Sequence, residues 1–169
     1  ADVGVVKDLA THDIDLTSWI TNKKYKKISA FTGYHSGKEH EDIVSITAMM
    51  EDGVVANHII DWLSPNKIRE TRILGEKGCL IADTLNVKLA FYPNALYDPN
   101  EFKGVVDGNI TYYKLDKKEP LLSEHEAFRD YIIGDSSNVA TIESGVEVLR
   151  VCEAVLKSAK TGNSVSLVS

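Results

Sequence analysis

The sequence is 169 residues long, with 43% hydrophobic and 26% charged residues, a composition typical of a folded globular protein and not of a disordered chain. Its formal net charge is −6, and the dense basic run is confined to residues 23–27. Because a nucleic-acid-binding surface needs clustered lysine and arginine to neutralise phosphates, we expect no nucleic-acid partner.

No apolar stretch approaches the roughly 20 residues that span a bilayer, so no membrane-spanning helix is expected. The two cysteines, Cys79 and Cys152, lie far apart in the sequence and in different predicted elements. We therefore expect no disulfide framework, and this cysteine usage fits the reduced environment of the cytoplasm.

The first predicted elements are a helix over residues 7–21 and a strand over residues 25–34. Asp8 is the expected N-cap of the helix, because its short carboxylate can accept from a free backbone N–H. The apolar positions at helical spacing are Leu9, Leu16 and Ile20, with Trp19 at their edge. They predict the buried stripe of this helix.

Two alternating segments, residues 43–50 and 54–62, flank Asp52-Gly53, which predicts a hairpin with a two-residue turn. The expected pairing places Ile43, Ser45, Thr47, Met49, Ala56, His58, Ile60 and Trp62 on one face, and Val44, Ile46, Ala48, Met50, Val55, Asn57, Ile59 and Asp61 on the other. Both faces are largely apolar. We therefore expect helices to cover one face and a second subunit to cover the other.

The remaining elements alternate with turn signals. Strands are predicted over residues 68–74, 79–83, 87–92, 110–115 and 164–168, a long loop over 93–109, and helices over 123–134 and 142–161. Thr141 is the expected N-cap of the last helix and Gly162 its end. A helix, a mainly antiparallel meander and two further helices predict an α+β fold.

The chemistry-bearing residues gather on the first helix. Asp8, His12 and Asp15 fall within roughly 60° of one another at 100° per residue, which suits proton transfer because a carboxylate can orient an imidazole and raise its basicity. Two other interpretations stay open. Asp8 could only cap the helix beside a packed His12, or the pair could hold Zn²⁺. A third zinc ligand would have to come from His35, His40, His58 or His125, and none of these has ligand spacing to the pair.

Motifs for other chemistry are missing from the sequence. It contains no G-x-G-x-x-G, no phosphate-binding P-loop and no G-x-S-x-G elbow. The chain by itself therefore offers no dinucleotide-binding residues and no nucleophile for a covalent intermediate.

The sequence resembles the C-terminal domain of Gfo/Idh/MocA oxidoreductases over nearly its whole length. The first segment that carries the resemblance is residues 4–16. Its pattern is a glycine, three residues, an aspartate, three residues and then His-Asp-x-Asp, and Trp19 follows in the apolar helix. The further matches are Glu51-Asp52-Gly53, Asp61-Trp62, Pro65 to Arg69, Leu74 to Gly78, Asp83, Pro120-Leu121, Phe128, Ala154, Ser158, Gly162 and the closing Val-Ser-Leu.

This resemblance implies an open, mainly antiparallel sheet with helices on one face, similar to the C-terminal fold of glyceraldehyde-3-phosphate dehydrogenase. Residues 1–169 would be a single substrate-binding and oligomerisation domain. The chain's own partner would be an N-terminal Rossmann domain, which is absent from this sequence and would bind NAD or NADP. The exposed sheet face would form a homo-oligomer.

The resemblance also implies the site. His12 would act as general acid/base on the hydroxyl of a sugar, polyol or nucleotide sugar, and Asp8 would support it. The candidate substrate-binding residues are Lys7, Asp15 and Tyr34, with the loops 35–42 and 93–109 near them. Lys7 could reach an anionic substrate group or be a solvated lysine. No metal site and no cofactor-binding residue are expected in this chain.

Two functions follow. The first is the catalytic and oligomerisation half of an NAD(P)-dependent dehydrogenase, inactive as an isolated fragment. The alternative is a stand-alone, non-catalytic binding or dimerisation module. The Asp8/His12 arrangement favours the first, because a binding module has little use for it.

Overall fold

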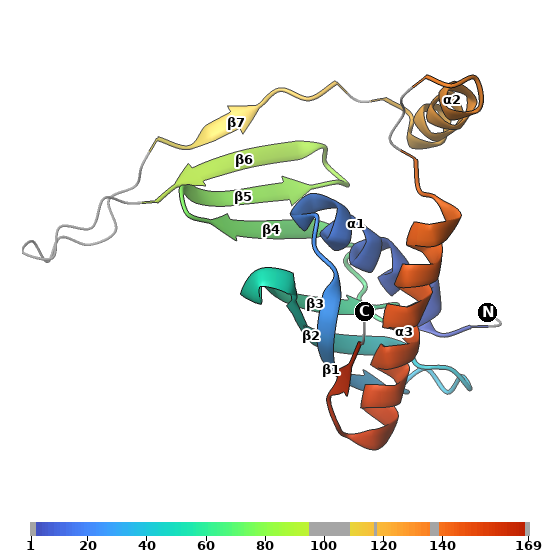
Figure 1. Cartoon of the computed structure of the whole chain (residues 1–169). Helices are drawn as coiled ribbons and strands as arrows, with labels where there is room; N and C mark the ends of the chain where they lie inside the picture. Colours follow the sequence, from blue (N-terminus) through green and yellow to red (C-terminus); the bar gives the residue numbers. More distant parts are fainter. Residues whose placement is uncertain (1–2, 95–108, 117, 136–138, 168–169) are drawn as a thin grey trace, which may run out of the picture. The chain divides into compact units, whose positions relative to one another are not determined.

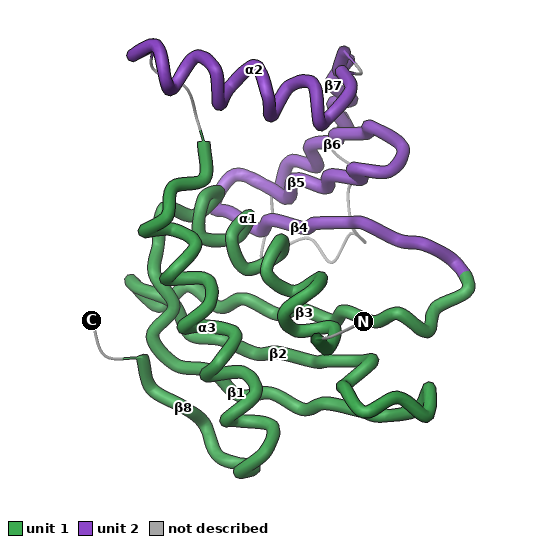
Figure 2. Tube along the Cα trace, turned by 90° about the vertical axis from the view of Figure 1, so that its right-hand side faces the viewer, with its two compact units in different colours: residues 1–65, 138–169 green, residues 66–137 purple. Residues whose placement is uncertain are grey.

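The structure is a computed structural model that describes residues 3–94, 109–116, 118–135 and 139–167. The chain forms two compact units, one from residues 1–65 and 138–169 and the other from residues 66–137 (Figure 2). Each unit is built around an antiparallel four-stranded sheet. The predicted α+β class is confirmed, and the strands divide into two sheets. That residues 1–169 act as one substrate-binding domain stays a prediction.

The first unit holds the helices that carry the site. Its strands are β1 (Tyr25–Gly33), β2 (Ile43–Met50), β3 (Val55–Asp61) and β8 (Val165–Ser166), in the order β3-β2-β1-β8 (Figure 1; β8 is labelled in Figure 2). Its helices are the π-helix η1 (Val6–Ala10), α1 (Thr11–Thr21) and α3 (Ile142–Thr161). Helix α3 packs on β1, and η1 packs on α3 and β3. The core between them is apolar: Val6, Ile14, Ile28, Val44, Ile46, Val151 and Val155 are all buried. Helices therefore cover one face of this sheet, as predicted.

The hairpin of β2 and β3 differs from its predicted register by one residue. Ala48 pairs with Ala56 across the strands, and Ile46 pairs with His58. His58 and Ile60 therefore share the inner face of the sheet with Val44, Ile46 and Ala48, whereas the prediction placed them on the other face. The turn has three residues, Glu51–Gly53, and not two. A shift of one residue exchanges the two faces of a strand.

Glu51 explains the longer turn. Its backbone N–H donates to Lys24 O at 3.0 Å, and its carboxylate accepts from the Lys24 N–H at 3.1 Å. Glu51 is thus hydrogen-bonded to Lys24, the residue before β1, and does not pair with β3. Asp52 and Gly53 both have positive φ, as the Asp-Gly signal predicted, but within this longer turn.

The first helix begins at Val6, and Asp8 is not its N-cap. The first turn is the π-helix η1, capped by Val5 without a side-chain hydrogen bond. The buried residues of the segment are Val6, Ala10 and Ile14, whereas Leu9, Leu16 and Ile20 are half-buried. A π-turn holds more residues per turn than an α-turn, so it shifts the buried face away from the stripe predicted for a regular α-helix.

The predicted ends of α3 are confirmed. The Thr141 hydroxyl accepts from the Ser144 N–H at 3.2 Å, and Gly162 closes the helix in the left-handed conformation. At the far end, the Ser158 hydroxyl accepts from the Ala30 N–H at 3.0 Å and donates to Asn163 O at 2.8 Å. These two bonds fix the last turns of α3 against β1.

The second unit contains the strands β4 (Glu70–Gly75), β5 (Gly78–Asp83), β6 (Lys88–Pro93) and β7 (Thr111–Tyr113), paired in that order, and the helix α2 (Pro120–Ile132). Each was predicted within a few residues. Helix α2 starts earlier than expected because Glu119 accepts from the Leu122 N–H at 2.6 Å and proline occupies the first helical position. Most of the predicted loop 93–109 lies outside the described residues.

Candidate active site

The sequence-predicted catalytic residues lie on one continuous helical segment. Asp8 is in η1, and His12 is the second residue of α1, with Asp15 one turn later. The side chains of Asp8 and His12 are exposed, and Asp15 is half-buried. Among the described residues, neither the Asp8 carboxylate nor the His12 imidazole forms a hydrogen bond or ion pair. The pair is therefore open to a small molecule on its solvent side.

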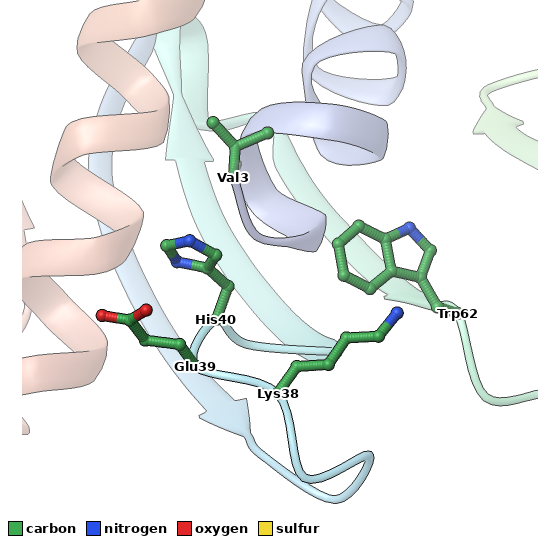
Figure 3. Close-up of a pocket in the computed structure, with 5 residues that line it drawn as sticks. All are labelled: Val3, Lys38, Glu39, His40 and Trp62. Atoms are coloured by element: carbon green, nitrogen blue, oxygen red, sulfur yellow. The ribbon is translucent and has the colours of Figure 1, made fainter. Parts of the chain in front are cut away.

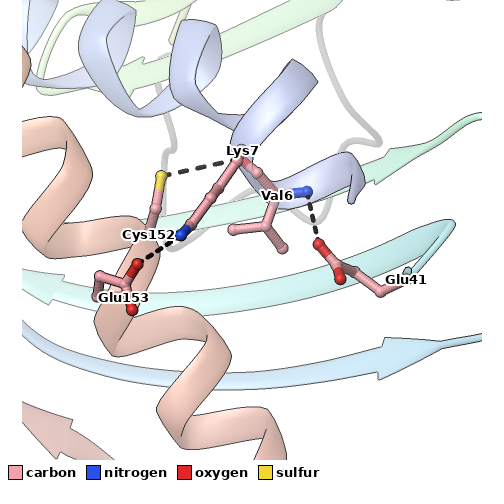
Figure 4. Close-up of polar contacts among 5 residues, drawn as sticks. All are labelled: Val6, Lys7, Glu41, Cys152 and Glu153. Atoms are coloured by element: carbon pink, nitrogen blue, oxygen red, sulfur yellow. Dashed lines mark hydrogen bonds and ion pairs between the residues drawn. The ribbon is translucent and has the colours of Figure 1, made fainter. Parts of the chain in front are cut away.

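The opposite side of η1 is fixed by polar contacts to two other elements (Figure 4). The Val6 N–H donates to Glu41 Oε1 at 3.2 Å, and the Val5 N–H donates to the Glu41 carbonyl at 3.0 Å. On α3, the Cys152 thiol lies 3.7 Å from Val6 O. Glu41 and Cys152 are buried, so they satisfy the backbone of η1 where water does not reach.

Gly4 makes the Glu41 contact possible. A Cβ at Gly4 would overlap the Glu41 carboxylate, so only glycine leaves room for that side chain beneath the start of η1. Gly4 opens the motif that carries the family resemblance, and the structure gives it a packing role.

Lys7 is engaged within the chain. Its ammonium lies 2.6 Å from Glu153 Oε1 on α3, and this hydrogen bond and charge raise the pKa of Lys7. The sequence left two alternatives for Lys7, a substrate contact or a solvated lysine. The structure shows a third role, an ion pair that links η1 to α3. Burial raises the pKa of the Cys152 thiol to about 11, so this cysteine is protonated at neutral pH and inert as a nucleophile.

A pocket lies where β1 and β3 end and η1 begins. It has a volume of about 290 Å³ and is lined by Val3, Lys38, Glu39, His40 and Trp62 (Figure 3). The Lys38 ammonium lies 5.2 Å from the centroid of the Trp62 ring, a cation–π distance. The pocket therefore combines an aromatic wall with three charged or titratable side chains, all within the first unit.

Asp42 fixes the loop that supplies Lys38, Glu39 and His40 to this pocket. Its buried Oδ2 accepts from the backbone N–H groups of His35 and Ser36 at 2.6 and 2.5 Å, and its carbonyl accepts from the Trp62 N–H at 3.0 Å. Although burial raises the pKa of the Asp42 carboxyl, hydrogen bonds from Ser36 and His35 and the nearby imidazole lower it more, and the net pKa is lowered. Loop 34–42 is thereby folded back onto the end of β3.

The structure places the predicted substrate residues at different points. Lys7 and Asp15 share the helical segment with the catalytic pair, whereas Tyr34 is exposed directly after β1, at the end of the sheet that holds the pocket. Sequence reasoning missed Trp62, Lys38 and His40 as pocket residues. Loop 35–42 was predicted as a substrate loop, but no pattern in it showed which side chains turn inward.

Among the described residues, no three His, Cys, Asp or Glu side chains are grouped so that they could hold a metal ion. The zinc interpretation of Asp8 and His12 thus finds no third ligand in that part of the chain. Of the helices that the structure describes, none has the length and apolar character needed to cross a membrane.

Comparison with known proteins supports the family. The family model described as GFO/IDH/MocA C-terminal domain matches residues 2–81, which hold η1, α1 and the strands β1 to β4 in full. Residues 2–81 of the chain thus match the C-terminal domain of this family. No curated protein matches it.

Solved structures of the same fold share little sequence with the chain. UDP-N-acetylglucosamine 3-dehydrogenase GnnA from Acidithiobacillus ferrooxidans has a TM-score of 0.79 at 22% identity, over 93% of this chain and 47% of that one. GenD2 from gentamicin A biosynthesis, in complex with NAD, has a TM-score of 0.74 at 19% identity, over 100% and 49%. The transcriptional regulator Gal80p from Kluyveromyces lactis has a TM-score of 0.73 at 18% identity, over 96% and 45%. The chain thus spans about half the length of these structures.

Proposed function

We propose that this chain is the substrate-binding half of a nicotinamide-dependent oxidoreductase that oxidises a hydroxyl group of a sugar, polyol or nucleotide sugar. The observation that carries the proposal is the Asp8/His12 pair. Both side chains are exposed on a helical segment whose other side is fixed by Glu41, Cys152 and Glu153. A fixed backbone with a free imidazole is what a general base requires, because the base must meet its substrate in one geometry.

In the proposed reaction, His12 accepts the proton of the substrate hydroxyl. Asp8, four residues earlier, favours the imidazolium that results, since a carboxylate near a cation stabilises its charge. The pocket beside η1 is of a size that holds one sugar-sized group, with the Trp62 ring as an apolar wall and Lys38 and His40 as hydrogen-bond donors. The name of GnnA, a UDP-N-acetylglucosamine 3-dehydrogenase, supports a nucleotide-sugar substrate, and the GenD2 complex with NAD supports a nicotinamide cofactor.

The chain's own residues do not fit a dinucleotide. Its sequence has no glycine-rich phosphate loop, so a second domain must hold the cofactor. A nicotinamide cofactor held there would supply the hydride acceptor for the substrate carbon.

The test is a substitution of His12 in the protein that contains this chain together with its nucleotide-binding domain. His12→Asn should lower kcat/KM on a responsive sugar by a factor of about 10²–10⁴, the usual contribution of a general base, with unchanged cofactor affinity. His125→Asn, at another exposed histidine on α2, is the matched control and should retain activity. An active His12→Asn enzyme would remove His12 from the mechanism.

A non-catalytic function is the alternative, and one observation favours it. Gal80p, described as a transcriptional regulator, has the same fold, so the fold by itself does not require catalysis. If the protein binds a sugar but shows no turnover with NAD or NADP, and His12→Asn leaves that binding unchanged, the binding-module function replaces the dehydrogenase.

A further inference from the structure

The pocket beside η1 has one aromatic wall and one ammonium group among the residues that line it. Lys38 is an exposed residue, but its ammonium lies 5.2 Å from the centroid of the half-buried Trp62 ring. Contact with an aromatic face restrains a lysine side chain that would otherwise move freely in water. Trp62 therefore fixes one positive charge at the wall of the pocket.

The backbone around the pocket is held by two adjacent residues. The Glu41 carbonyl accepts from the Val5 N–H, and the Asp42 carbonyl accepts from the Trp62 N–H, both at 3.0 Å. Both residues are buried, and their carboxylates also accept from backbone N–H groups. The start of η1, loop 34–42 and the end of β3 are thus joined before any ligand arrives. A preformed site binds more tightly, because the ligand does not have to order its walls.

The side chains that face the pocket differ in charge and direction. Figure 3 shows Lys38 extending toward the Trp62 ring, the His40 ring between Val3 and the loop, and the Glu39 carboxylate turned away from Trp62. Within the part of the chain that the structure describes, neither the Lys38 ammonium nor the His40 imidazole forms an ion pair or a hydrogen bond. Their N–H groups are therefore available to a ligand.

We propose that this pocket takes an anionic group attached to a sugar, a phosphate or a carboxylate, and that Lys38 and His40 contact it. An ammonium offers three donors and an imidazole at least one, and hydrogen bonds between a cation and an anion are the strong ones. Trp62 is the positioning residue, since it holds Lys38 at the wall. The proposal rests on the proposed function in taking this pocket as the substrate site. It narrows the substrate to sugars that carry a phosphate, as nucleotide sugars do, or a carboxylate.

The two tryptophans of the chain allow the pocket to report its own occupancy. Trp19 is 63% exposed on α1, so Trp19→Phe leaves Trp62 as the single indole fluorophore. Its emission is followed while the 169-residue chain is titrated with glucose 6-phosphate or glucuronate, each compared with glucose. A third arm compares UDP-N-acetylglucosamine with N-acetylglucosamine and with uridine.

At least one anionic probe should bind about 10-fold or more tightly than its neutral counterparts, because a charged acceptor forms the stronger hydrogen bond. The arm that responds distinguishes a phosphate from a carboxylate. The proposal is wrong if no anionic probe binds, or if each neutral counterpart binds equally well. Should Trp19→Phe not fold, the NMR signal of the Trp62 indole N–H in the parent chain gives the same readout.

Substitutions of Lys38 separate a ligand contact from a structural role. Lys38→Gln should weaken binding of the anionic probe by about 10-fold or more and leave that of the neutral sugar unchanged. Lys38→Arg keeps the charge and the contact with the ring, so it should retain binding. Lys27→Gln, at an exposed lysine toward the opposite end of β1, is the matched control and should bind as the parent does. Unchanged anion binding by Lys38→Gln would overturn the contact.

Glu39→Gln tests the opposite charge of the same loop. It should leave anion binding unchanged or strengthen it, since a nearby carboxylate can only repel an anion. Tighter binding of glucosamine than of glucose, lost in Glu39→Gln, would show that the pocket takes a cation and would overturn the proposal. None of these measurements uses cofactor or turnover. Failure of the anion site therefore leaves the His12 assay intact, and an active His12→Asn enzyme leaves the anion site intact.

Discussion

At the scale of single residues, the position of Asp8 and His12, the proposed catalytic pair, depends on the buried carboxylate of Glu41. Glu41 is 6% exposed and accepts from Val6 at the start of η1, in space that exists because residue 4 has no side chain. A backbone N–H left without its acceptor in a buried position costs about 1–3 kcal/mol. The local stability of η1, and with it the place of Asp8, is therefore set by Gly4 and Glu41 together.

Substitution of Gly4 tests this dependence. Gly4→Ala should lower the free energy of unfolding of the chain by about 1–3 kcal/mol, because the new Cβ displaces the Glu41 carboxylate from Val6. Denaturant unfolding followed by circular dichroism measures the change. Gly145→Ala is the control with opposite sign, since nothing lies near its Cβ and alanine favours the helical state by about 0.5–1 kcal/mol. A neutral Gly4→Ala would show that Glu41 moves aside without loss.

At the scale of elements, the sequence predicted which segments form helices and strands, but not which of their side chains face the core. The ends of α3 were predictable because Thr141 and Gly162 act through local geometry. The hairpin register and the start of η1 were not, because each is decided by a distant contact. Glu51 is held by Lys24, and Val6 is held by Glu41.

The same distinction applies to the candidate site. Asp8, His12 and Asp15 could be placed on one helix from their spacing, and the structure keeps them on one helical segment. The pocket could not be predicted, since Val3, Lys38 and Trp62 are brought together by the fold of three separate segments. Asp42, which fixes that fold, is a single residue between a polar loop and an apolar strand.

Loop 34–42 should respond to acid through Asp42. The pKa of this carboxyl in the folded chain lies below the ordinary 3.8, so the folded state binds its proton less readily than the unfolded state. Its contribution to stability is full above pH 3.8 and is lost as the pH falls from 3.8 through the folded pKa.

Unfolding measured across this pH window tests the contribution of Asp42. Asp42→Asn should be less stable than the parent at neutral pH and should lose less stability on acidification. Asp116→Asn, at an exposed aspartate, is the matched control, which should follow the parent. Parallel pH profiles for the parent and Asp42→Asn would contradict the prediction.

At the scale of the whole molecule, the outer face of the first sheet offers an interaction surface, defined here by Phe31, Ser45, Thr47, Met49, Val55, Asn57 and Ile59. Phe31 and Ile59 are 74% and 76% exposed and flank Ser45 in one row across the sheet. With the corrected register this face mixes apolar rows with a polar row, in which Thr47 donates to Asn57 at 2.9 Å. Such a mixture is typical of interfaces between subunits.

We expect the chain to self-associate through this outer face. Light scattering should give at least a dimer mass, and Ile59→Lys should shift it to the monomer because the interface would bury an unpaired charge. Ile142→Lys, at an exposed isoleucine of α3, should not change the mass. A monomer at high protein concentration would count against the surface.

The chain alone should not bind NAD or NADP. Its sequence contains no G-x-G-x-x-G pattern, the loop that holds the pyrophosphate in dinucleotide-binding domains. Calorimetric titration with either cofactor should give no measurable heat of binding, and no sugar should be turned over. Binding of either cofactor by the isolated chain would place a cofactor site in this chain and would contradict the proposal that a second domain binds the cofactor.

The interrupted path of the first unit has a consequence for synthesis. Residues 66–137 separate the hairpin strands of that unit from α3, which supplies Val151 and Val155 to its core. On the ribosome, β1, β2 and β3 emerge well before the helix that covers them. Until residue 155 has left the exit tunnel, the apolar face of this sheet is exposed to water. Covering it requires contacts between segments about a hundred residues apart, and such long-range contacts form slowly. The vulnerable species for this protein is therefore the unfinished nascent chain, which is the form that chaperones recognise.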